Sequence, residues 1–154
     1  MLYDSEGSRL FERITTLPEY YPTRTERDIL ANYAEPIIRG LGSGCSRPLR
    51  LLELGAGTAA KTGILLKAAT RLRSEVTYFP VDVSSDALDA ASDSIGCLLP
   101  DVRLQPMVAN YVTHPPKLEW FDGTTLGMYI GRSAPIHGML RLGIAMHRAW
   151  QAGP

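Results

Sequence analysis

Three scarcities narrow the class of protein that this sequence encodes. The 154 residues hold two cysteines, Cys45 and Cys97, without a C-x-x-C pair, which argues against a disulfide framework and a zinc knuckle. No apolar run approaches membrane-spanning length, and the acidic N-terminus does not have the pattern of an export signal. Sixteen basic residues balance sixteen acidic ones, so no global field attracts nucleic acid or a membrane surface. We therefore expect a cytoplasmic protein with a small-molecule partner.

Alternating strand-like and helical stretches fill the middle of the chain. Apolar residues make up 45% of the sequence, enough for one domain with a core. Strands are predicted over residues 49–54, 76–83, 102–109 and 124–130, with helical stretches between the first three. This alternation is typical of an α/β fold with a parallel sheet and helices on both faces. Ligands bind such sheets at the carboxyl ends of the strands, an edge where we expect Gly55, Asp82, Asn110 and Gly131.

The N-terminal part is predicted to be helical and interrupted by a loop. Apolar residues at helical spacing predict a first helix over residues 8–14. The prolines in Leu-Pro-Glu-Tyr-Tyr-Pro, residues 17–22, indicate an ordered loop and not a regular helix. Thr23 and Glu26 have capping-box spacing, so a second helix is predicted from there to the glycines at 40–42.

The strongest local signal is Glu-Leu-Gly-Ala-Gly, residues 53–57, between a predicted strand and a predicted helix. Glycine at such a turn permits a positive φ and lets a ligand approach the backbone. The spacing of Gly55, Gly57 and Ala60 also suits a dinucleotide, with Asp82 on a ribose hydroxyl. The Glu53 carboxylate would repel a pyrophosphate, whereas it suits a ligand that carries an ammonium and a sulfonium. S-adenosylmethionine is therefore favoured over NAD.

Four more residues are predicted to hold this cofactor. Asp82 ends its strand, where an acid can accept both ribose hydroxyls; the alternative is a helix cap or a solvated acid. Lys61 would pair with the cofactor carboxylate; the alternative is a solvated helix lysine. Asn110 offers an amide to the adenine amino group and Tyr111 a ring beside it, although Asn-Tyr is also a common loop start. No metal site is predicted, because the histidines lack a cluster of ligands.

Three strings carry a resemblance to a known family: YDSEGSRLFE at residues 3–12, LPEYYPTR at 17–24 and ELGAG at 53–57. Together they resemble the histidine-specific S-adenosylmethionine-dependent methyltransferases. The resemblance implies a Rossmann-like class I methyltransferase sheet and methylation of the α-amine of L-histidine, the first step towards ergothioneine. It also implies a catalytic position near the transferred methyl group for Tyr3 and a substrate contact for Tyr20.

The resemblance fades after residue 131, where the family continues with a Ser/Thr-Ile-Gly-Asn-Phe-type segment and this chain reads Arg-Ser-Ala-Pro-Ile. We predict an N-terminal helical segment contributing to the active site (1–46), a cofactor-binding core (47–131) and a divergent C-terminal helix (132–154), with the sheet truncated after about four strands. An N-methyltransferase acting on an amino acid is the leading hypothesis. Two alternatives stay open: an inactive fragment or interaction module that pairs with another chain through its sheet edge, and an NAD-dependent oxidoreductase.

Overall fold

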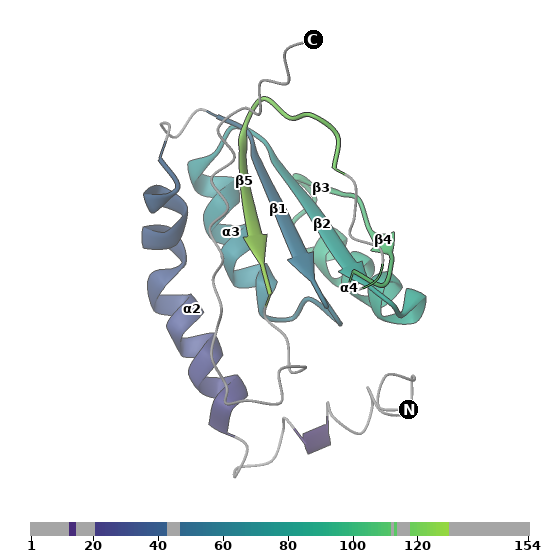
Figure 1. The fold of residues 1–154 in the computed structure, drawn as a ribbon. Coiled ribbons are helices and arrows are strands. Elements are labelled where there is room, and N and C mark those ends of the chain that lie inside the picture. The colour runs from purple at the N-terminus through teal and green to yellow at the C-terminus, as the bar shows by residue number, and fades with distance from the viewer. Residues whose placement is uncertain (1–12, 15–20, 43–46, 112, 114–117, 130–154) are drawn as a thin grey trace.

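The computed structural model describes residues 13–14, 21–42, 47–111, 113 and 118–129. Figure 1 shows a sheet with helices packed against it. In chain order the elements are α2 (Tyr21–Gly40), β1 (Leu49–Leu54), α3 (Thr62–Leu72), β2 (Val76–Asp82), α4 (Ser85–Leu98), β3 (Val102–Leu104), β4 (Met107–Val108) and β5 (Thr124–Met128). Across these described stretches, no helix combines the length and the apolar character needed to cross a bilayer.

The strands form one parallel sheet in the order β3-β2-β1-β5, with β4 also paired to β2. The connections from β1 to β2 and from β2 to β3 step in one direction, and β5 then returns to the other side of β1. The strand order therefore reverses at β1, which makes the carboxyl ends of β1 and β5 a switch point of the kind where α/β proteins bind ligands. The predicted Rossmann-like α/β fold is confirmed.

The predicted strand over residues 102–109 is divided into two short pieces. β3 and β4 keep one register against β2, since Val76 pairs with Val102 and Val81 with Met107. In that register Pro106 lies opposite Pro80, and neither residue has an N–H to donate to the ladder. The backbone N–H of Gln105 still donates to the Tyr78 carbonyl at 2.9 Å, so the interruption is confined to the facing prolines.

Helices α3 and α4 cover one face of the sheet. A Cβ atom at Gly63 of α3 would lie 3.5 Å from Cδ1 of Ile95 in α4, so the two helices are neighbours on the same side. Figure 1 shows both behind the strands, with α2 running beside α3. The sequence predicts helices on both faces of the sheet. Among the described residues, helices cover one face.

Helix α2 begins at Tyr21, so the predictions of a loop through Pro22 and of a helix start at Thr23 are wrong. Proline is tolerated in a first helical turn, because the first N–H groups of a helix have no intrahelical acceptor. Four apolar residues of this segment are buried in the same core as the sheet: Leu30, Ala34, Ile38 and Leu41. The described N-terminal helix is thus packed into the core of the sheet domain.

Arg50 holds a loop against the opposite face of the sheet. Its guanidinium carbon lies 5.1 Å from the ring centre of Phe79 and 4.3 Å from that of Phe121. One guanidinium N–H also donates to the carbonyl of Glu119 at 2.9 Å. Cation–π contacts and this hydrogen bond therefore fix the segment that leads into β5.

Candidate functional site

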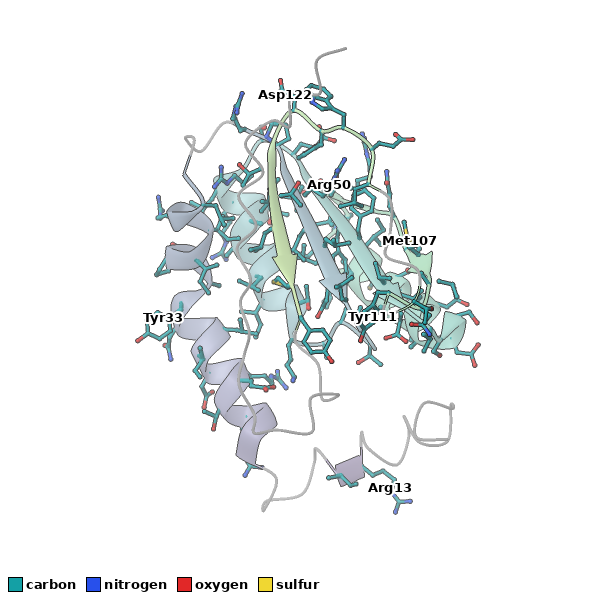
Figure 2. All side chains as sticks on the ribbon, in the orientation of Figure 1. Arg13, Tyr33, Arg50, Met107, Tyr111 and Asp122 are labelled. Atoms are coloured by element: carbon teal, nitrogen blue, oxygen red, sulfur yellow. The ribbon has the colours of Figure 1, made fainter. Side chains whose placement is uncertain are left out.

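Residues that follow four parallel strands meet at one edge of the sheet. Gly55 follows β1, Asp82 ends β2, Asn110 and Tyr111 follow β4, and Tyr129 follows β5. Figure 2 shows Tyr111 at this edge, beyond the end of the long strands. The predicted grouping of Gly55, Asp82 and Asn110 is confirmed; Gly131 lies outside the described residues.

The glycine loop has the backbone conformation predicted for it. Gly55 has φ +69° and Gly57 has φ +52°, and Ala59 is also left-handed at φ +54°. The N–H groups of Gly55 and Ala56 both donate to the Val81 carbonyl, at 2.8 and 3.2 Å. The loop is therefore fastened to the end of β2, with no side chain at its two glycines to keep a ligand away.

Asp82 joins the glycine loop to helix α4. Its Oδ2 accepts from the Gly57 N–H and its Oδ1 from the Ser84 N–H, each at 3.0 Å. The N-cap of α4 is Ser84, whose Oγ accepts from the Ala87 N–H, so the cap alternative for Asp82 is wrong. Each carboxylate oxygen has two lone pairs, and one hydrogen bond leaves each able to accept from a ligand hydroxyl.

Lys61 precedes α3 and forms an ion pair with Glu26 of α2. The side chains are 22% and 27% exposed, which rules out the fully solvated lysine offered as the alternative. An ammonium has three donor positions, so this pair leaves Lys61 able to bind a second anion. The ion pair connects α2 to the start of the helix that follows the glycine loop.

Glu53 lies under the glycine loop on the helix-covered face and is 2% exposed. Its Oε2 accepts from the hydroxyls of Thr62, at 2.6 Å, and Tyr78. Burial raises the pKa of Glu53 to about 7, against the lowering effect of the two hydroxyls and the Lys61 ammonium. Burial and the neighbouring carboxyl raise the pKa of Tyr78, which therefore stays a hydrogen-bond donor. Glu53 is thus held inside the fold by two hydrogen bonds, and it can influence a ligand at the glycine loop through the electric field of its carboxyl group and not by direct contact.

Asn110 and Tyr111 have different surroundings. Asn110 is exposed, and its Oδ1 accepts from the Thr113 N–H at 3.3 Å, as at the start of a turn. The Tyr111 side chain is directed at the glycine loop, where its hydroxyl lies 3.3 Å from the position that a Gly55 Cβ would take. Of this predicted pair, Tyr111 is therefore the residue in contact with the loop.

Tyr129 is a residue at this edge that the sequence reasoning missed. Its ring lies 3.7 Å from the same Gly55 Cβ position, and it packs edge-to-face on Tyr111 with 6.2 Å between ring centres. The available signal was an aromatic residue near the end of a predicted strand, but the strand order was needed to place it beside Gly55. Tyr3 and Tyr20, the predicted catalytic and substrate residues, lie outside the described residues.

Alanine at the two loop glycines is expected to give unequal losses of stability. Both positions have positive φ, which costs an alanine about 1 kcal/mol. Among the described residues, the Gly55 Cβ would meet the Tyr111 hydroxyl, whereas the Gly57 Cβ would have no described atom within 4 Å. Urea unfolding should therefore show a larger loss for Gly55→Ala than for Gly57→Ala, and Tyr111→Leu should remove the excess. Equal losses in both backgrounds would contradict the close contact at Gly55.

Comparison with known proteins assigns the chain to a family. The family model described as "Histidine-specific methyltransferase, SAM-dependent" matches residues 1–134. The histidine N-alpha-methyltransferase of Mycolicibacterium smegmatis is 36% identical over 81% of this chain, and that of Mycobacterium tuberculosis 40% identical over the same share. The chain spans 40% of the length of each. The solved structure of DszA carbon methyltransferase aligns at 22% identity and a TM-score of 0.43, over 82% of this chain and 32% of that one. The family model covers most of the chain, and the two relatives are 36% and 40% identical to it. This chain therefore belongs to the histidine-specific, S-adenosylmethionine-dependent methyltransferases.

Proposed function

We propose that this chain binds S-adenosylmethionine as part of an N-methyltransferase that acts on the α-amine of an amino acid, with L-histidine as the favoured substrate. The observation that carries the proposal is the hydrogen bond between Asp82 and the Gly57 N–H, which fixes a carboxylate beside the two loop glycines. The substrate comes from the relatives, two of which are histidine N-alpha-methyltransferases. The cytoplasmic location predicted from the sequence is part of the same proposal.

The residues at the edge of the sheet suit the parts of this cofactor. Asp82 would accept from the ribose hydroxyls through the lone pairs that Gly57 and Ser84 leave free. Lys61 would bind the carboxylate of the amino-acid end with a donor not used by Glu26. Asn110 is assigned to the adenine amino group, on the far side of Asp82 from Lys61.

In the proposed reaction, the main role of the protein is to align the methyl group of the cofactor with the amine of the substrate. When bound, S-adenosylmethionine supplies an electrophilic methyl group on its positively charged sulfur. The glycine loop, Asp82 and Lys61 would fix the direction of that methyl group, and alignment of two reactants supplies much of the acceleration in such displacements. Tyr3 and Tyr20 are assigned to the methyl-transfer region and to the substrate amino acid, as the family resemblance implies.

Calorimetric titration of the chain with S-adenosylhomocysteine, and separately with NAD, tests the cofactor. We expect binding of S-adenosylhomocysteine and none of NAD, because Lys61 would bind the amino-acid carboxylate of the first ligand, a group that NAD lacks. Absence of S-adenosylhomocysteine binding would overturn the proposal, and preferential NAD binding would favour the oxidoreductase alternative.

Methyl transfer from isotopically labelled S-adenosylmethionine tests the substrate. Histidine and tryptophan are supplied in parallel, and methylated product is measured by mass spectrometry. The proposal expects label on the histidine α-amine. A chain that binds the cofactor and methylates neither amino acid corresponds to the inactive-fragment alternative.

A further inference from the structure

Tyr129 and Tyr111 form an aromatic pair over the first glycine of the loop. The two rings come from the ends of β5 and β4 and reach Gly55, at the end of β1, from the two sides of the switch point. Their edge-to-face packing, with 66° between the ring planes, holds each ring in place against the other. A rigid aromatic surface thus adjoins the backbone that the proposed cofactor would approach.

The two anchors of the proposed cofactor indicate which of its atoms meets this surface. Asp82 is assigned to the ribose and Lys61 to the carboxylate at the opposite end. The sulfur joins the ribose to the amino-acid chain, so it must lie between these anchors. The glycine loop occupies that interval, since Gly57 is bonded to Asp82 and Lys61 follows the loop directly.

We infer that Tyr129, supported by Tyr111, lies against the positively charged sulfur of the cofactor and makes the site prefer this sulfonium to the neutral thioether left after methyl transfer. The inference rests on the proposed function and adds a specificity-determining residue to it. A cation within about 6 Å of a tyrosine ring centre is attracted by the ring face. A thioether of nearly the same shape lacks that attraction, so the same rings would favour release of the product.

Neither of the two carboxyl groups beside the loop is assigned to the positively charged sulfur, so the aromatic rings are the group that would attract it. Glu53 is the nearest carboxyl group under the loop, but it is buried and its pKa is raised to about 7, so at neutral pH it carries only part of a negative charge. Asp82 accepts from Gly57 and Ser84, and its remaining lone pairs are assigned to the ribose. The aromatic pair supplies the described side chains that lie nearest to the Gly55 Cβ position.

The test compares the affinities of S-adenosylmethionine and S-adenosylhomocysteine by calorimetry in four proteins: the unchanged chain, Tyr129→Leu, Tyr129→Phe and Tyr33→Leu. Tyr129→Leu removes the ring and should lower the preference for the sulfonium about tenfold. Tyr129→Phe keeps the ring and should keep the preference. Tyr33 is 57% exposed and lies on the side of α2 away from the sheet (Figure 2), so Tyr33→Leu is the control for loss of a tyrosine.

Several outcomes would overturn the inference, and they differ from failure of the proposed function. If the unchanged chain binds neither ligand, the proposed function and this inference both fail. If it binds both and Tyr129→Leu weakens them equally, Tyr129 has a structural role only and this inference alone fails. Should Tyr129→Leu not fold, pentafluorophenylalanine at position 129 keeps the ring shape and inverts its charge distribution. A preference unchanged by that replacement would also overturn the inference.

Discussion

Glu53→Gln is expected to remove a pH dependence of stability worth about 3 kcal/mol. Burial raises the pKa of Glu53 from 4.5 to about 7, so the folded chain binds a proton more tightly than the unfolded chain does. The stability that this proton contributes is fully present below pH 4.5 and is lost as the pH rises through about 7. A glutamine keeps an oxygen that can accept from Thr62 and Tyr78 and has no charge to bury. The variant should therefore be more stable than the unchanged chain above neutral pH and similar to it in acid.

Urea unfolding followed by circular dichroism, at a series of pH values on both sides of the Glu53 pKa, measures this effect. The difference between the two proteins isolates the contribution of Glu53 from that of every other group in the chain. Glu35→Gln is the matched control, because Glu35 is exposed on α2 between Arg39 and Arg71. Its difference curve should be nearly flat. Parallel curves for Glu53→Gln and the unchanged chain would show that Glu53 has the same pKa in the folded and the unfolded chain, which would contradict this prediction.

Asp82→Asn is expected to lower the affinity for S-adenosylhomocysteine about 100-fold, the loss of two charge-assisted hydrogen bonds. An asparagine offers one acceptor oxygen where the carboxylate offers two. Its amide NH₂ would face the N–H of either Gly57 or Ser84, both of which now donate to Asp82. Thermal stability should fall as well, by roughly the 1–3 kcal/mol of an unsatisfied donor.

Asp122→Asn serves as the control for this substitution. Asp122 is exposed, follows the loop held by Arg50 and pairs with Arg47 at 3.4 Å, at the other end of the strands from Asp82. Calorimetry should show unchanged affinity for Asp122→Asn. A loss of less than about fivefold for Asp82→Asn would mean that the ribose is not bound by this carboxylate.

Elements whose signals are local could be predicted from the sequence. The strand over residues 49–54 and the end of β2 at Asp82 follow from short patterns that contain their own boundaries. The positive φ of Gly55 and Gly57 likewise follows from glycine between a strand and a helix. These features depend on neighbours in sequence, so they needed no knowledge of the strand order.

Features that join distant segments could not be predicted. The ion pair between Glu26 and Lys61 and the contact of Tyr129 with Gly55 depend on which elements become neighbours in the fold. The interruption at Pro106 was visible as a proline within a predicted strand. The second proline, which lies opposite at position 80, could not be recognised without the register of β3 and β4 on β2. The early start of α2 was missed because Pro22 was taken as a helix breaker and not as a first-turn residue.

The reversal of strand order at β1 has a kinetic consequence. Leu49 pairs with Val76 on one side and with Thr124, much later in the sequence, on the other. Closing the longer loop costs more conformational entropy, and contacts between distant residues form slowly. We therefore expect β1, α3 and β2 to assemble first, with β5 joining an existing sheet. Tyr129 follows β5, so the edge of the sheet that carries the candidate site would be completed only when β5 joins. A ligand bound at this edge would therefore slow the detachment of β5, the step with which we expect unfolding to begin.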